Sequence, residues 1–85
     1  MTIIMADKNK ETNAVATGIV LDAYQKLESK EIAYKTFLES INIKKVKEEV
    51  HRQRPVIEEQ VGAETFNAIV TEVVFEYFNK ADKLQ

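Results

Sequence analysis

The residues best suited to chemistry surround the only histidine of the chain, His51. Glu48 precedes it by three residues, a spacing that places a carboxylate and an imidazole on one face of a helix. Di-iron bundles use this Glu-x-x-His unit twice, together with two further glutamates from other helices. A chain with a single histidine cannot supply the second unit, although a symmetric dimer could. We therefore interpret Glu48 and His51 as solvated side chains and expect neither a metal nor a cofactor.

Nucleophilic catalysis has as little support as metal catalysis. The chain has no cysteine, and its serines, Ser29 and Ser40, lie where helix caps are expected. Neither a glycine-rich phosphate loop nor a zinc-ligand spacing occurs in the sequence. Glu72 and Glu76 would share a helix face, but an exposed acidic pair at this spacing is normally solvated. The sequence predicts that the protein is not an enzyme and has no small-molecule substrate.

A basic segment, residues 43–54, indicates a possible contact with nucleic acid. Its cationic residues are Lys44, Lys45, Lys47, Arg52 and Arg54. If residues 30–41 and 43–53 form a helix-turn-helix, the lysines occupy the first turns of the recognition helix, where base and phosphate contacts lie. The turn between the two segments lacks the customary glycine, and the net charge of −2 provides no basic footprint. A small DNA-binding regulator of this kind is therefore the alternative interpretation.

Phe75 is the aromatic residue least expected at its position. It projects from the polar side of the last predicted helix, near Glu72 and Glu76, while apolar residues cover about half of that helix, more than the usual stripe. Such a helix is contacted from more than one direction, either inside the bundle or at a subunit interface. Aromatic anchors dominate interface energies. We therefore predict a partner-binding surface of Phe75, Glu72 and Glu76, with Arg52 and Arg54 as a charged rim that steers the encounter.

The composition fits one globular domain. The chain has 85 residues, of which 45% are hydrophobic and 31% charged. No apolar run approaches the roughly 18 residues of a membrane span, and the short apolar start lacks the features of a signal peptide. Together with the absence of disulfides, these features predict a cytoplasmic protein with no membrane contact.

The elements that must position these residues are predicted to be helices. With only two glycines and one proline, few breakers interrupt a periodicity of 3.6 residues. We predict an all-α fold, a small single-domain bundle of four to five helices with a long apolar C-terminal helix. The expected segments are 11–28, 30–41, 43–53, 55–61 and 63–82. Residues 11–41 fit either one helix or two.

Two boundaries are predicted from local chemistry. Residues 1–10 are expected to form a flexible tail ahead of a helical domain at 11–85, and residues 1–4 precede Met5, which resembles a more usual start. Pro55 is expected to open a new helix, because proline suits the first helical position. Cations before Pro55 and acids after it suit the ends of two successive helix dipoles.

These observations together favour a non-catalytic function. We predict a small regulator, inhibitor or accessory module that binds another protein through a helical surface. The excess apolar surface of the C-terminal helix further predicts that the protein self-associates as a homodimer.

Overall fold

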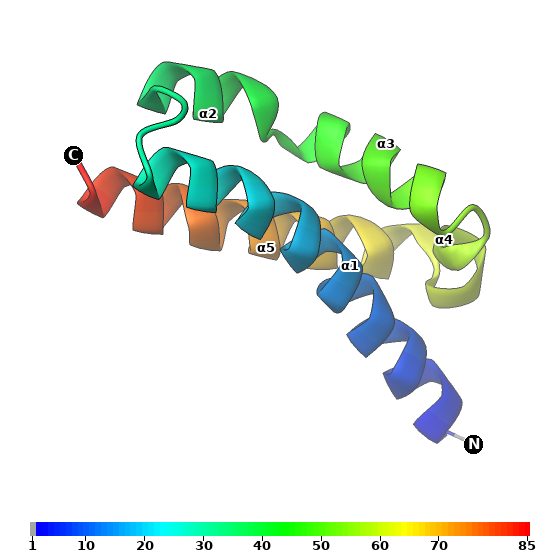
Figure 1. The fold of residues 1–85 in the computed structure, drawn as a ribbon. Coiled ribbons are helices and arrows are strands. Elements are labelled where there is room, and N and C mark those ends of the chain that lie inside the picture. The colour runs from blue at the N-terminus through cyan, green and yellow to red at the C-terminus, as the bar shows by residue number, and fades with distance from the viewer. Residues whose placement is uncertain (1) are drawn as a thin grey trace.

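Five helices and no strand make up the part of the chain that the computed structural model describes, residues 2–85 for the backbone and 8–85 for the side chains. The helices are α1 (Thr2–Glu28), α2 (Tyr34–Ser40), α3 (Ile43–Gln53), α4 (Ile57–Val61) and α5 (Ala63–Lys83) (Figure 1). The prediction of an all-α bundle of four to five helices with a long C-terminal helix is confirmed.

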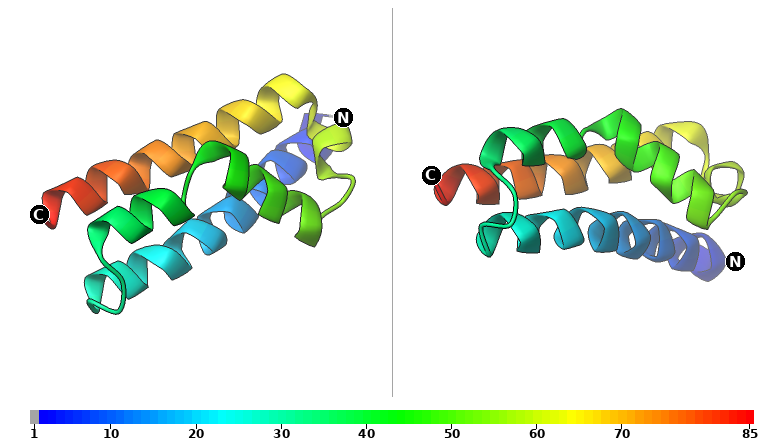
Figure 2. Two further views of the ribbon diagram at one scale, coloured as in Figure 1. Left: turned by 90° about the horizontal axis from the view of Figure 1, so that it is seen from above. Right: turned by 45° about the horizontal axis from the view of Figure 1, so that its top comes forward.

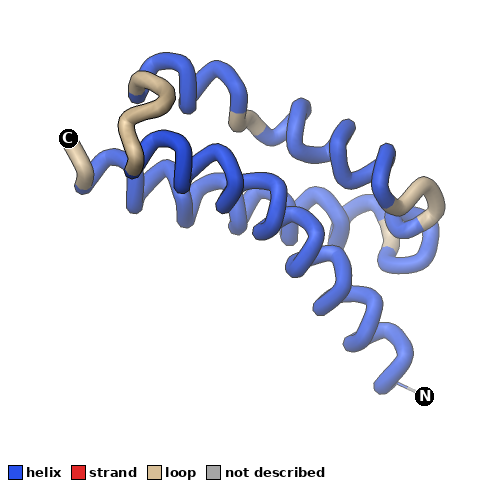
Figure 3. The backbone as a smooth tube through the Cα atoms, in the orientation of Figure 1, coloured by secondary structure: helices blue, strands red, loops and turns tan. Residues whose placement is uncertain are grey.

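The helices form two layers. α1 and α5 lie side by side, α2 and α3 lie across them, and α4 closes one end of the bundle (Figure 2). The connections between helices are short, and the first turns of α1 extend beyond the bundle (Figure 3). The molecule is therefore elongated, with principal extents of 44 × 21 × 18 Å.

The core lies between the two layers. α5 buries residues at helical spacing along its whole length, namely Phe66, Val70, Val73, Val74, Tyr77 and Ala81. α1 contributes Ala16, Val20 and Leu27, and Phe37 of α2 is completely buried. Both layers are needed because α5 alone carries more apolar surface than one neighbouring helix can cover.

α1 is longer than the sequence indicates. It begins at Thr2 rather than near residue 11. Thr12, which resembles a helix cap in the sequence, instead lies in the interior of α1, and its side chain is buried. Its Oγ1 donates to the carbonyl oxygen of Lys8 at 2.8 Å. Residue 1 and the side chains of residues 1–7 lie outside the described part, so the flexibility of residues 1–10 stays a prediction.

Residues 11–41 form two helices rather than one. α1 ends at Glu28, and Lys30 adopts a left-handed conformation with φ of 65° before α2 begins at Tyr34. Ile41 and Asn42 connect α2 to α3. Asn42 caps α3, because its Oδ1 accepts a hydrogen bond from the backbone N–H of Lys45 at 2.9 Å.

The predicted boundary near Pro55 is present, but proline does not open the next helix. α3 ends at Gln53, and the backbone N–H of Arg54 donates to the carbonyl oxygen of Val50 at 2.7 Å. Pro55 lies in the turn, and α4 starts only at Ile57. Gly62, with φ of 92°, then separates α4 from α5.

Candidate protein-binding surface

The side chain of Phe75 is 53% exposed near the middle of α5. Its ring centroid lies 6.3 Å from that of Phe78 in an edge-to-face arrangement. Phe78 is half-buried and lies 6.2 Å from the fully buried ring of Phe37. The exposed ring is therefore braced against the core. We call its surroundings on α5 the Phe75 face, which consists of Ala68, Thr71, Glu72, Phe75, Phe78 and Asn79.

The bracing continues through the core as a series of aromatic contacts. Tyr24 of α1 lies 6.3 Å from Phe37 and 5.4 Å from Tyr77, both edge to face. Each such pair contributes about 0.5–1.5 kcal/mol beyond the area it buries. The helix that carries Phe75 is thereby held to both α1 and α2.

The predicted acidic neighbours of Phe75 also lie on the exposed side of α5. Glu72 and Glu76 are both exposed. Glu76 Oε2 lies 3.3 Å from Lys80 Nζ, and the same ammonium lies 4.6 Å from the centroid of the Tyr77 ring. Glu72 thus lies on the Phe75 face, whereas Glu76 lies about 100° round the helix from Phe75 and pairs with Lys80. The role of both carboxylates in binding stays a prediction.

The predicted basic rim lies elsewhere. Arg52 forms an ion pair with Glu49 one turn earlier on α3. Arg54 Nε donates to Glu11 Oε2 at 2.9 Å and so contacts α1. The structure therefore does not bring Arg52 and Arg54 to the Phe75 face, and their steering role stays a prediction.

The three lysines of the possible DNA-binding helix differ in their surroundings. Lys45 Nζ donates to the carbonyl oxygen of Glu39 at 2.9 Å. Lys47 Nζ donates to Asn67 Oδ1 of α5 at 3.2 Å. Lys44 is exposed. Two of the three ammonium groups thus donate to neutral oxygens within the molecule, and all three keep their charge.

His51 makes a contact that the sequence does not indicate. Its Nε2 lies 2.6 Å from Glu58 Oε1 of α4 rather than beside Glu48, and its ring packs 5.1 Å from that of Phe66. The imidazole therefore joins α3 to the helices that follow it. Among the residues with described side chains, no group of three or more histidines and carboxylates could hold a metal ion.

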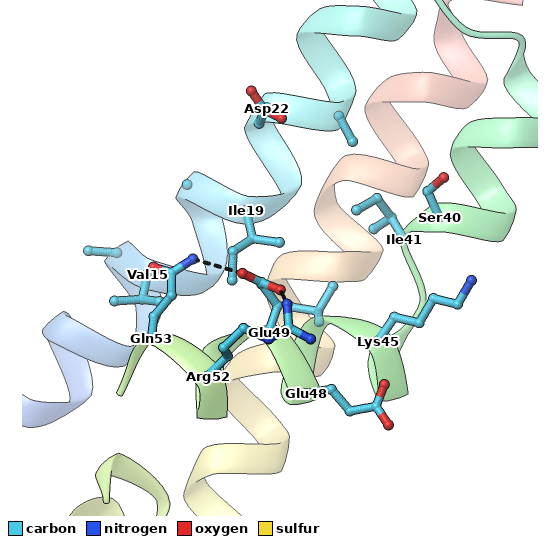
Figure 4. Close-up of a pocket in the computed structure, with 14 residues that line it drawn as sticks. Val15, Ile19, Asp22, Ser40, Ile41, Lys45, Glu48, Glu49, Arg52 and Gln53 are labelled. Carbon is cyan, nitrogen blue, oxygen red and sulfur yellow. Dashed lines mark hydrogen bonds and ion pairs between the residues drawn. The ribbon is translucent and has the colours of Figure 1, made fainter. Parts of the chain in front are cut away.

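A groove with a volume of about 830 Å³ lies between α1 and α3. Val15 and Ile19 of α1 form its apolar wall, and Glu48, Glu49 and Arg52 line the opposite side (Figure 4). Sequence reasoning missed this groove because it depends on how α1 and α3 cross. The sequence feature that relates to this groove is the presence of two small residues, Ala14 and Gly18, one helical turn apart on α1. They place no bulky side chain in the groove.

Comparison of the chain with protein-family models, curated proteins and solved structures finds no match. Within the part of the chain that the structure describes, no helix combines the length and the apolar character needed to cross a membrane. The geometry of the molecule itself must therefore support any functional interpretation.

Proposed function

We propose that this protein is a non-catalytic binding module, a small cytoplasmic regulator, inhibitor or accessory factor, that docks its Phe75 face onto another polypeptide. The observation that carries the proposal is the half-exposed phenylalanine in the middle of a helix whose other side is fully packed. Val56 and Leu84, the other large exposed apolar residues with described side chains, lie in a turn and at the C-terminal end of α5.

The physical advantage of Phe75 is preorganisation. A ring that already packs on Phe78, which in turn packs on Phe37, loses less conformational freedom when a partner covers it. Aromatic side chains in this situation commonly supply much of the binding energy of an interface. The carboxylate of Glu72, one turn away, adds a polar contact at the edge of the apolar centre.

The alternative, a helix-turn-helix regulator, has weaker support. Only two residues connect α2 to α3, fewer than the three or four of a typical helix-turn-helix turn. Also against it, Arg52 and Arg54 pair with carboxylates, and the net charge of −2 provides no basic surface. Contact with DNA remains an alternative rather than the conclusion.

Replacement of Phe75 by glutamate tests the proposed function. We expect Phe75→Glu to abolish capture of the cellular partner, because a charge would be buried at the centre of the interface. The measurement is an affinity purification from lysate of the source cells, with and without nuclease, followed by identification of the captured proteins.

Val56→Glu is the matched control, because Val56 is 54% exposed and lies at the α3–α4 turn. Capture should survive this change, and circular dichroism should show equal helicity for all three proteins. A partner retained equally by both variants would contradict the role of Phe75. Capture that depends on nucleic acid would instead favour the DNA-binding alternative.

A further inference from the structure

We propose that the polypeptide that covers the Phe75 face is a second copy of this chain, in a two-fold dimer whose α5 helices run parallel. In this dimer the two Phe75 rings meet near the axis, and Glu72 of each copy meets Lys44 of the other. The inference rests on the proposed function, since it names the partner of the same surface.

The two flanks of the Phe75 face carry opposite charges. At about 100° per residue, Glu72 lies about 60° from Phe75 on one side of α5, and Asn67 lies about 80° from it on the other. The hydrogen bond from Lys47 to Asn67, at 3.2 Å, places α3 on the Asn67 side. The Glu72 carboxylate therefore borders the aromatic centre on one side, and an α3 ridge that carries Lys44 and Lys47 together with Glu48 borders it on the other.

Lys44 is the lysine best placed to contact Glu72 of a second copy across the Phe75 face. It shares one ridge of α3 with Lys47 and His51, both of which contact α5. Since α3 and α5 run in opposite directions (Figure 1), Lys44 lies further along α5 than Lys47, toward the level of Glu72 and Phe75. Lys44 and Glu72 are both exposed, and neither has an ion-pair partner among the described side chains.

Charge complementarity selects the parallel arrangement. A two-fold axis along α5 places the acidic flank of each copy against the basic flank of the other. An axis across α5 places acid against acid, because each flank then faces its own equivalent. Like charges opposed in an interface cost free energy and exclude the wrong orientation.

Sedimentation equilibrium of the full chain tests the dimer. We expect the wild type to approach twice its mass of 9.7 kDa as its concentration rises from about 1 to 500 μM, a span that covers weak specific association. Phe75→Glu should remain monomeric, and Val56→Glu should dimerise like the wild type. A wild type that stays monomeric throughout this range overturns the inference. The lysate assay with Phe75→Glu then still decides the proposed function, because it does not require self-association.

A charge exchange tests the predicted contact. Glu72→Lys and Lys44→Glu should each weaken dimerisation by about tenfold, because each creates two like-charge contacts per dimer. The double variant should restore the wild-type dissociation constant. Equal helicity of the variants shows that the changes act on association. A double variant that is as weak as the single variants, or weaker, overturns the Glu72–Lys44 contact.

A single thiol tests the orientation, because the chain has no native cysteine. In the parallel dimer, the two copies of Asp82→Cys lie at the same level and should form a disulfide-linked dimer under mild oxidation. In an antiparallel dimer centred on Phe75 they would lie roughly 21 Å apart along the helices, too far for a disulfide. A wild type that dimerises while Asp82→Cys fails to cross-link overturns the parallel arrangement.

Discussion

The ion pair of Arg54 and Glu11 joins residues that lie 43 positions apart in the sequence. The guanidinium donates to the carboxylate at 2.9 Å and holds the pKa of Glu11 below its ordinary value, with a smaller contribution from Lys8. Partial desolvation of the carboxyl acts in the opposite direction. A carboxyl with a lowered pKa contributes stability above its ordinary pKa, and this contribution is lost as the pH falls through the folded-state pKa.

Arg54→Gln is expected to raise the pKa of Glu11 toward its ordinary value. The stability of this variant should consequently fall less between about pH 5 and pH 3 than that of the wild type, because less proton linkage is lost. The pKa is measured by carbon-detected NMR titration of the Glu11 carboxyl. Arg52→Gln is the control, since Arg52 pairs with Glu49 instead. A Glu11 titration that Arg54→Gln leaves unchanged would contradict the assignment.

The helices depend on two glycines in opposite ways. Gly62, at the junction between α4 and α5, adopts φ of 92°, a conformation that L side chains rarely enter. Gly18 lies inside α1, exposed, with no atom within 4 Å of the position that a Cβ would occupy. The first glycine therefore permits an element boundary, whereas the second only weakens a helix.

The same substitution at the two glycines should change stability in opposite directions. Gly18→Ala is expected to raise the free energy of unfolding by about 0.5–1 kcal/mol through better helix propensity. Gly62→Ala is expected to lower it by about 1 kcal/mol or more through backbone strain, although the space around Gly62 is open. Urea denaturation of both variants at equal protein concentration measures the difference. Two changes of the same sign would show that backbone conformation at Gly62 does not govern this junction.

The molecule as a whole has little stability in reserve. A chain of 85 residues is expected to have a free energy of unfolding of only about 4–13 kcal/mol. Its core depends on a few large side chains, of which Phe37 and Phe66 are completely buried. Loss of one of these rings would remove a large fraction of the free energy of unfolding.

Two phenylalanines on α5 should therefore respond very differently to truncation. Phe66→Ala is expected to cost about 3–5 kcal/mol, because it leaves a cavity in the core. Phe75→Ala should cost less than about 1 kcal/mol in the monomer, since its ring is half-exposed and mainly contacts Phe78. Urea denaturation at a low protein concentration, where self-association is negligible, measures both. A large loss for Phe75→Ala would mean that the ring serves folding rather than binding.

The fold class follows from the sequence because it depends on local properties. A periodicity of 3.6 residues and the scarcity of glycine and proline determine that the chain forms helices, and the bounds of α3 agree with the predicted segment 43–53. The exposure of Phe75 was predictable for the same reason, because three of its neighbours at helical spacing, Thr71, Glu72 and Asn79, are polar. Within one helix, sequence spacing alone decides which side chains share a face.

Contacts between different helices were decided only by the tertiary structure. The sequence did not indicate that Arg54 would bind Glu11, that His51 would bind Glu58, or that Lys47 would place α3 beside the Phe75 face. Each of these contacts depends on the angle and register at which two helices cross. The packing of the whole apolar core sets that geometry, and no local pattern encodes it.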